Sequence, residues 1–233
     1  RTDQFIFDLL NNEESAFEFS KIVAFVDDAK FANKRLLSRS ARYSGLLDKL
    51  EFIQAVTPGA LPDASQLEGV KSWIAVLEDD PNMLETCKQV AAVAKQSSSL
   101  ENVAILLTGA TELDAAACQQ VVADLKGNSE KQSYTLVAVG KLEEHAEGKV
   151  PYQYREFGTS DGTIPANAIY SRDESLRMIT ELLQLECGVN TAYAFAEVYN
   201  GNQTEAKLVK GLREGGYARP QEIDFMMRDG PQV

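Results

Sequence analysis

The segment 102–125, "NVAILLTGATELDAAACQQVVADL", decides which fold this chain can adopt. It starts with a short apolar run, continues through Thr-Gly-Ala-Thr, and ends in a pattern typical of an amphipathic helix. A strand, a turn and a helix in direct succession form the unit from which parallel sheets are built. A glycine-containing turn between a strand and a helix is also where dinucleotide-binding proteins hold a phosphate. The rest of the sequence has to decide between a binding loop and a simple connection.

Five short apolar runs, this one included, alternate with helical patterns along the chain. The predicted strands are residues 21–26, 50–55, 72–77, 103–107 and 134–139, and the predicted helices are residues 30–37, 81–95 and 115–126. Each run is apolar at successive positions, as in strands that are buried on both faces of a parallel sheet. We therefore expect an α/β fold with a Rossmann-like, doubly wound and mostly parallel sheet. All five strands should belong to that sheet, with residues 21–26 and 72–77 adjacent or nearly so.

One further helix is marked more clearly than the others. Ser171 supplies an N-cap and Glu174 follows three residues later, which is the spacing of a capping box. An apolar stripe at helical spacing consists of Leu176, Ile179, Leu182 and Leu183. This pattern predicts an amphipathic helix that begins near Ser171.

Composition and charge exclude several classes of function. The 233 residues include 23 Lys and Arg against 35 Asp and Glu, which gives a net charge of −12. This charge argues against a nucleic-acid partner, because binding to a phosphate backbone requires a basic face. No apolar run approaches the roughly 20 residues of a membrane span, so no transmembrane segment is predicted.

The cysteines and the single histidine give no sign of a metal site. Cys87, Cys118 and Cys187 lie far apart in the sequence and are interpreted as reduced thiols in the core. His145 stands in a charged stretch with no second ligand at a suitable spacing. No candidate nucleophile has a visible base in the sequence, so neither a metal ligand nor a nucleophile is predicted.

The order of these elements resembles the NmrA-like, atypical branch of the short-chain dehydrogenase/reductase superfamily. The resemblance rests on "RTDQFIFDLL" (1–10), "KIVAFVDDAKFANKRLL" (21–37), residues 50–76, residues 119–145 and "IYSRDESLRMITELLQL" (169–185). These stretches are similar to the end of the glycine-rich loop with its helix, the second strand with its exit, a stretch that follows it, the helix with the fifth strand, and a later helix of that branch. The resemblance covers residues 1–199 and implies an NAD(P)-binding domain there. Residues 200–233 would then form a C-terminal helical extension.

The resemblance also bears on the two loops that could hold a phosphate. It implies that Arg1 and Thr2 are the last residues of the glycine-rich loop, so that the first strand and most of this loop precede Arg1. Thr108–Thr111 then follows the fourth strand, and Glu112 stands where a third glycine would be needed. Its charge and size are unfavourable beside a phosphate. We interpret Thr-Gly-Ala-Thr as a structural turn, with a phosphate loop as the alternative.

If a dinucleotide binds, the resemblance assigns its site to Arg1, Thr2, Asp27, Asp28 and Gly140. Asp27 and Asp28 end the second strand, where an acidic side chain can accept a hydrogen bond from a ribose hydroxyl. The same pair is also a good start for a solvent-exposed helix, and both interpretations stay open.

Gly140 closes the tripeptide Ala-Val-Gly, where members of the branch have Arg-Pro-Gly. The Tyr-x-x-x-Lys pair that carries catalysis in the wider superfamily is absent from residues 113–127. We therefore predict no catalytic residue, no metal and no firmly bound cofactor, with NAD(P) as the cofactor that the fold could accept.

These expectations favour a non-catalytic protein of the NAD(P)-binding fold that acts as a binding, assembly or scaffold subunit of a larger complex. The alternative is an NAD(P)H-dependent reductase of the atypical short-chain dehydrogenase type. Plant and algal members of the branch accompany photosynthetic complexes, so the resemblance implies a thylakoid photosystem or its assembly machinery as partner. The resemblance also implies that the protein is located on the stromal side of the chloroplast, with the cytoplasm as the alternative location. Residues 200–233 are either a helical hairpin packed on their own domain or an arm that docks on a partner.

Overall fold

The computed structural model divides the chain into two compact units, Arg1–Gln66 and Leu67–Val233. The structure describes residues 19–37, 47–78, 80–128, 130–143, 152–166, 168–172, 175–176, 179, 182–183 and 188–197. The predicted C-terminal extension, residues 200–233, and the loop residues Arg1 and Thr2 lie outside the described residues.

The first unit contains a parallel pair of strands connected through a helix. Its elements are β1 (Ile22–Val26), α2 (Ala29–Leu37), the short 3-10 helix η2 (Leu47–Lys49) and β2 (Leu50–Gln54). The two strands pair in parallel from Ile22 opposite Leu50 to Val26 opposite Gln54. Every residue of both strands is half-buried or exposed. The apolar runs predicted at these places are therefore strands, but the described part of the unit leaves them only partly covered.

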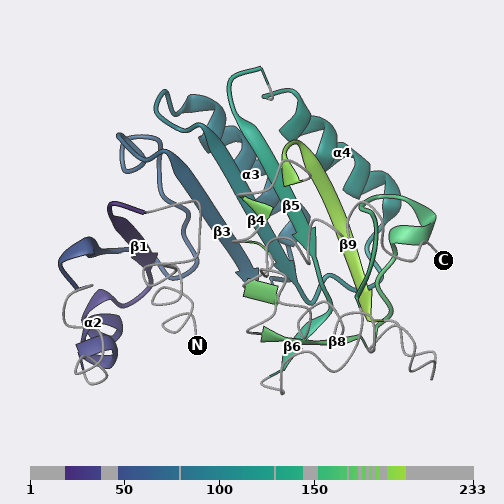
Figure 1. The fold of residues 1–233 in the computed structure, drawn as a ribbon, viewed down its shortest axis with the longest axis horizontal. Helices are drawn as coiled ribbons and strands as arrows, with labels where there is room; N and C mark the ends of the chain where they lie inside the picture. Colours follow the sequence, from purple (N-terminus) through teal and green to yellow (C-terminus); the bar gives the residue numbers. More distant parts are fainter. Residues whose placement is uncertain are drawn as a thin grey trace, which may run out of the picture. The chain divides into compact units, whose positions relative to one another are not determined.

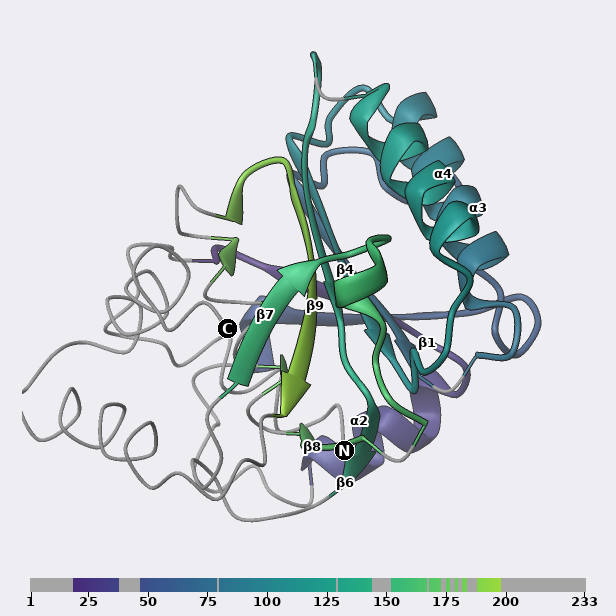
Figure 2. The same cartoon turned by 90° about the vertical axis from the view of Figure 1, so that its right-hand side faces the viewer.

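The second unit is built on a mostly parallel sheet whose described strands have the order β3-β4-β5-β9-β7, the first four labelled in Figure 1 and β7 in Figure 2. These strands are β3 (Ser72–Glu78), β4 (Asn102–Thr108), β5 (Ser133–Ala138), β9 (Thr191–Glu197) and β7 (Tyr152–Glu156). The first four run parallel to one another, and β7 pairs antiparallel with β9. A small parallel pair, β6 (Lys141–Glu143) with β8 (Ile169–Ser171), and the 3-10 helix η3 (Ser160–Gly162) complete the described elements.

Two helices cover one face of this sheet. Figure 2 shows α3 (Met83–Gln96) and α4 (Ala115–Lys126) side by side on the same side of the strands. Right-handed crossovers from β3 to β4 and from β4 to β5 place consecutive helices on the same face. The two helices bury apolar residues at helical spacing, namely Met83, Cys87, Val90, Ala91, Ala94, Cys118, Val121 and Leu125. The core of the unit therefore lies between these helices and β4 and β5, which are almost completely buried.

The predicted amphipathic helix after Ser171 also packs into the core. Arg172, Ser175, Leu176, Ile179 and Leu182 are described as helical. The three apolar residues among them are buried, as the stripe predicts, and Leu183 is half-buried. Near the end of this segment the Thr135 hydroxyl on β5 donates to the carbonyl of Gly188 at 2.8 Å. The segment is thus anchored on the face of the sheet that bears Thr135.

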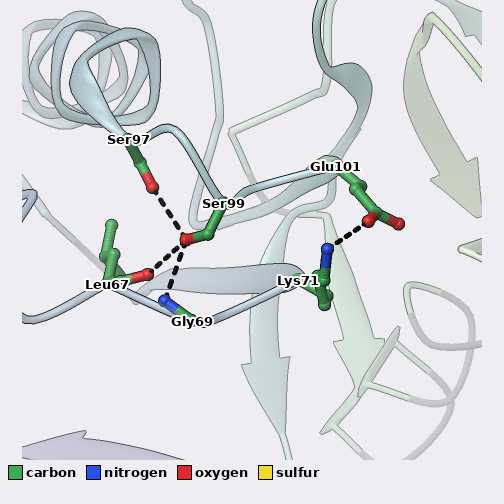
Figure 3. Close-up of polar contacts among 6 residues, drawn as sticks. All are labelled: Leu67, Gly69, Lys71, Ser97, Ser99 and Glu101. Atoms are coloured by element: carbon green, nitrogen blue, oxygen red, sulfur yellow. Dashed lines mark hydrogen bonds and ion pairs between the residues drawn. The ribbon is translucent and has the colours of Figure 1, made fainter.

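The amino ends of β3 and β4 are joined by contacts between the loops that precede them (Figure 3). The Ser99 hydroxyl donates to the Leu67 carbonyl at 2.9 Å and accepts from the Gly69 amide at 3.1 Å. Lys71 and Glu101, directly before the two strands, form an ion pair. This pair is well exposed, so it adds little stability. The half-buried Ser99 bonds the two loops to each other through the Leu67 carbonyl and the Gly69 amide.

The fold class predicted from the sequence is confirmed: the protein is α/β with a mostly parallel central sheet. The expectation of one sheet containing all five predicted strands is wrong. Among the described residues β1 pairs with β2 alone, and β3 pairs with β4 alone. The two groups of strands belong to different compact units, and among the described residues each group is hydrogen-bonded only within its own unit.

The buried and exposed valines of the second unit make a matched test of this core. Val137 on β5 is fully buried, whereas Val189 is 47% exposed. Val137→Ala removes two buried methyl groups and should lower the free energy of unfolding by about 2 kcal/mol. Val189→Ala should change it by less than about 0.5 kcal/mol. Chemical denaturation of the full chain measures both values, and equal effects would contradict this arrangement of the core.

Candidate functional site

The candidate site is the edge of the sheet at which β3, β4 and β5 end. Open α/β sheets bind their ligands outside the carboxyl ends of parallel strands. Here these ends carry Glu78, the segment Thr108–Glu112, and Val139 with Gly140. We call this set of residues the carboxyl edge.

An ion pair occupies the carboxyl end of β3. Arg172, at the start of the buried helical segment, donates from Nη1 to Oε2 of Glu78 at 2.7 Å. Its Nη2 donates to the other carboxylate oxygen, Oε1. The pair is therefore bidentate, the arrangement in which a guanidinium recognises carboxylates and phosphates. It joins residues that are 94 positions apart in the sequence.

The environment of the pair is partly protected from water. The Arg172 side chain is 16% exposed and that of Glu78 is 36% exposed. The hydrogen bonds from Arg172, together with its positive charge, lower the pKa of Glu78, while partial burial acts in the opposite direction. Glu78 is therefore an anion at neutral pH, and its charge is neutralised within the protein.

The amide groups of the Thr-Gly-Ala-Thr turn form hydrogen bonds within the protein backbone. Gly109 N donates to the Gly140 carbonyl at 2.9 Å, and Ala110 N donates to the Val139 carbonyl at 3.0 Å. The next two amides also donate to backbone carbonyls: Thr111 N to Gly109 O at 2.8 Å, and Glu112 N to Ile164 O at 3.0 Å. A phosphate loop needs amide groups that point at the ligand without a partner. In this turn all four amides donate to carbonyl groups of the protein backbone, which supports the structural interpretation of the motif.

Backbone conformation explains why a glycine stands in this turn. Gly109 has a φ of +69°, in the left-handed region that glycine adopts without strain. Glu112 has a φ of +53° and so adopts the left-handed conformation as well, although it is not a glycine. Between them Thr111 forms a parallel bridge with Ile164. The turn is thus shaped by its attachment to the 164 region.

Gly140, a predicted cofactor residue, is placed at the carboxyl edge and is in close contact with the chain. A Cβ atom at this position would lie 2.3 Å from the carbonyl oxygen of Ala168 and 2.7 Å from the Tyr170 ring. The amide of the next residue, Lys141, donates to Ala168 O at 2.9 Å. The glycine is therefore required for packing against residues 168–170, whatever else it contacts.

Thr108, the last residue of β4, carries an unusual side chain. The residue is completely buried, and its hydroxyl oxygen has no hydrogen-bond partner among the described residues. Leaving a buried hydroxyl unpaired costs about 1–3 kcal/mol. A buried hydroxyl without a partner in a folded protein needs an explanation. A bound ligand or a bound water molecule would supply one.

The two predicted acidic residues lie in the first unit, at the carboxyl end of β1. Asp27 Oδ1 accepts from the Gly59 amide at 2.9 Å, and Asp28 Oδ1 accepts from the Phe31 amide at 2.8 Å. The second bond caps α2, which agrees with the interpretation of Asp28 as a helix start. Both aspartates are exposed. Asp27 and Asp28, which are adjacent in the sequence, belong to the first unit, whereas Gly140 belongs to the second.

A small hollow lies beside the carboxyl edge, next to the start of α4. It is lined by Ala110, Leu113, Ala115, Cys118, Phe157, Gly158, Thr159, Gly162, Thr163 and Ile164. Its interior holds space for about one water molecule, far less than a nicotinamide ring needs.

Cys118, which lines this hollow, and Cys87 are buried and free, as predicted for core thiols. Burial raises the pKa of Cys118 to about 11 and that of Cys87 to about 12. Both are therefore protonated and unreactive at neutral pH.

Metal ligands and membrane spans are absent from the part of the chain that the structure describes. No group of three or more His, Cys, Asp or Glu side chains there could hold a metal ion. None of the described helices is long and apolar enough to cross a membrane. His145 and Cys187, for which no metal role was predicted, lie outside the described residues.

Sequence reasoning missed the two residues that dominate the carboxyl edge. Glu78 is the first charged residue after the apolar run of β3, and a charge at the carboxyl end of a buried strand is a usable signal for a site. Arg172 follows directly after the predicted N-cap, Ser171. Nothing in the sequence pairs these two residues.

No protein-family model matches the sequence, and no curated protein matches it. The resemblance to NmrA-like proteins therefore stays a prediction, and what the chain does has to be inferred from its own residues.

Two glycines provide a test of the packing at this edge. Gly140→Ala forces a methyl group into the Ala168 carbonyl and should lower the free energy of unfolding by about 3 kcal/mol. Gly127 ends α4 in a right-handed helical conformation, and its nearest atoms would be 3.5 Å from a Cβ. Gly127→Ala should therefore be neutral or stabilise the protein by up to about 1 kcal/mol. Denaturant unfolding separates the two outcomes, and a harmless Gly140→Ala would show that the contact does not exist in solution.

The ion pair predicts a pH dependence with a definite sign. Because the pKa of Glu78 is lowered in the folded state, its contribution to stability is present above its ordinary value of 4.5 and is lost as the pH falls through the lowered pKa. Glu78→Gln should remove this part of the pH dependence. Unfolding measured between about pH 7 and pH 3 should therefore show a smaller loss of stability in the variant than in the unmodified protein. Parallel curves would contradict the pairing of Glu78.

Proposed function

We propose that this chain is a non-catalytic protein of Rossmann-like fold that acts as a binding, assembly or scaffold subunit of a larger protein complex. One observation carries the proposal: the protein itself occupies the edge where an enzyme of this fold would bind its dinucleotide. The Glu78–Arg172 pair fills the end of β3, and the four amides after Thr108 donate to backbone carbonyls. Gly140 is packed against Ala168 and Tyr170.

Hydride transfer makes demands that these residues do not meet. The nicotinamide has to be held rigidly beside an acid that protonates the product, and short-chain dehydrogenases use a tyrosine with a lysine four residues later. The helix after β4, Ala115–Lys126, contains no tyrosine. An enzyme that loses one such element loses typically several orders of magnitude in rate. The proposal follows because several elements are missing from one site.

The partner and the location belong to the same proposal. The resemblance to plant and algal NmrA-like proteins supports a photosystem or its assembly machinery as partner, on the stromal side of the chloroplast. The net charge of −12 suits docking on a basic protein surface. Residues 200–233, with Phe225, Met226 and Met227, are the segment that we expect to dock.

One observation favours the alternative, an NAD(P)H-dependent reductase. Asp27 is exposed at the carboxyl end of β1, the place at which an acidic side chain of this fold accepts from the adenosine ribose. Its Oδ1 is used by the Gly59 amide, but a carboxylate accepts several hydrogen bonds. Dinucleotide binding through Asp27 would thus be the first sign of an enzyme.

The test measures binding and turnover in the full-length protein. We expect no saturable binding of NADH or NADPH by fluorescence and no oxidation of either with quinone or enone substrates. Saturable binding that Asp27→Asn weakens, while the control Asp48→Asn does not, would favour the reductase.

A second arm tests assembly in native extracts. Size-exclusion chromatography should find the full-length protein in a larger assembly, and a variant lacking residues 200–233 should leave it. Turnover that survives this deletion in a monomeric protein would reverse the proposal.

A further inference from the structure

Glu78 and Thr108 are neighbours on one face of the sheet. They are register partners at the ends of β3 and β4. Partners in adjacent parallel strands lie about 4.8 Å apart and point to the same face. Thr108, whose buried hydroxyl has no partner among the described residues, is therefore the cross-strand neighbour of the glutamate that Arg172 binds.

This face is also the one on which the segment of Arg172 is anchored. Thr135 is the register partner of Ala104, and Thr108 is four residues beyond Ala104 on the same strand, so Thr108 and Thr135 share a face. Thr135 donates to Gly188 at the far end of the segment. Arg172, at the near end, donates to Glu78. Arg172, Glu78 and Thr108 thus gather on one face at the carboxyl edge.

Two independent observations there point to a ligand with oxygen atoms. The first is the guanidinium of Arg172, whose parallel N–H groups are already matched to the two oxygens of a carboxylate. The second is the Thr108 hydroxyl, a donor that is fully buried and has no acceptor among the described residues. A carboxylate or phosphate group has enough acceptor positions to satisfy both.

We propose that Arg172 and Thr108 form a binding site for a small oxyanion, a carboxylate or a phosphate group, and that Glu78 holds this site closed until the oxyanion replaces it. The exchange keeps the charge of Arg172 neutralised, because one anion takes the place of another. Glu78, whose side chain is 36% exposed, turns to water when it is released. The site needs no amide from the Gly109–Glu112 turn, all of which are already bonded.

This proposal does not depend on the proposed function. A dinucleotide requires free amides and a deep pocket, whereas a single oxyanion requires only the guanidinium and the hydroxyl. Binding of NADH would overturn the proposed function and leave the oxyanion site open to its own test. Failure of the oxyanion test would leave the scaffold proposal untouched.

The experiment uses the full chain with sodium phosphate and sodium acetate as separate probes, each against sodium chloride at equal ionic strength. Binding is measured by the rise in thermal midpoint and by NMR titration of arginine side-chain signals. Glu78→Gln removes the competing carboxylate and should bind one of the two probes about tenfold more tightly than the unmodified protein. The probe that gains identifies the group as phosphate or carboxylate. Glu101→Gln breaks the exposed pair with Lys71 at the opposite edge and should behave like the unmodified protein.

Further variants connect the gain to the proposed residues. Adding Thr108→Val or Arg172→Gln to Glu78→Gln should remove most of the increased affinity, since each deletes one donor. If Glu78→Gln does not fold, Glu78→Asp shortens the competing side chain and should give a smaller gain in the same direction. Equal responses of the Glu78 variants, the Glu101 control and the unmodified protein would show an adventitious ion only. They would leave Glu78–Arg172 as a purely structural pair and overturn the proposal.

Discussion

The second unit depends on the complete burial of β4. This strand is hydrogen-bonded on both edges, and the residues from Val103 to Leu107 are at most 2% exposed. A strand in this position needs a partner on each side, because an unpaired buried amide or carbonyl costs as much as a lost hydrogen bond. β3 and β5 are therefore fixed in register against it, and α3 and α4 follow from the crossovers. The carboxyl ends of all three strands meet at one edge for the same reason.

At that edge the chain has to leave the sheet, and the way it does so limits what can bind there. The backbones after β4 and β5 approach closely enough for Gly109 and Ala110 to donate to Gly140 and Val139. Glycine permits such an approach whether the neighbour is a pyrophosphate or another backbone. The same residue type at the same place can thus serve packing where a relative would use it for a cofactor. Which of the two applies is decided by the partners of the amides.

These distinctions explain how much of the molecule the sequence could predict. Strands and helices such as β4 and α4 were predicted to within a residue or two, because hydrophobic period and turn residues are local properties. β9 was missed, since its "TAYAFAE" has small residues where the other strands have branched ones. The pairing of β1 and β2 outside the main sheet and the Glu78–Arg172 pair were missed because both depend on contacts between distant parts of the chain. Local pattern has no information on which remote side chain completes a site.

The two ion pairs at opposite ends of β3 show what such a contact adds. Lys71 and Glu101 are 67% and 65% exposed, so water competes for both charges and the pair contributes little. Glu78 and Arg172 are far less exposed, and taking them from water carries a cost that offsets much of the energy of their attraction. The Glu78–Arg172 pair is therefore poor evidence of a gain in protein stability, but it shows where the Arg172 side chain is held. It fixes a guanidinium on the carboxylate of Glu78, the register partner of Thr108, at the edge where parallel sheets bind ligands. That placement gives the carboxyl edge its chemical character.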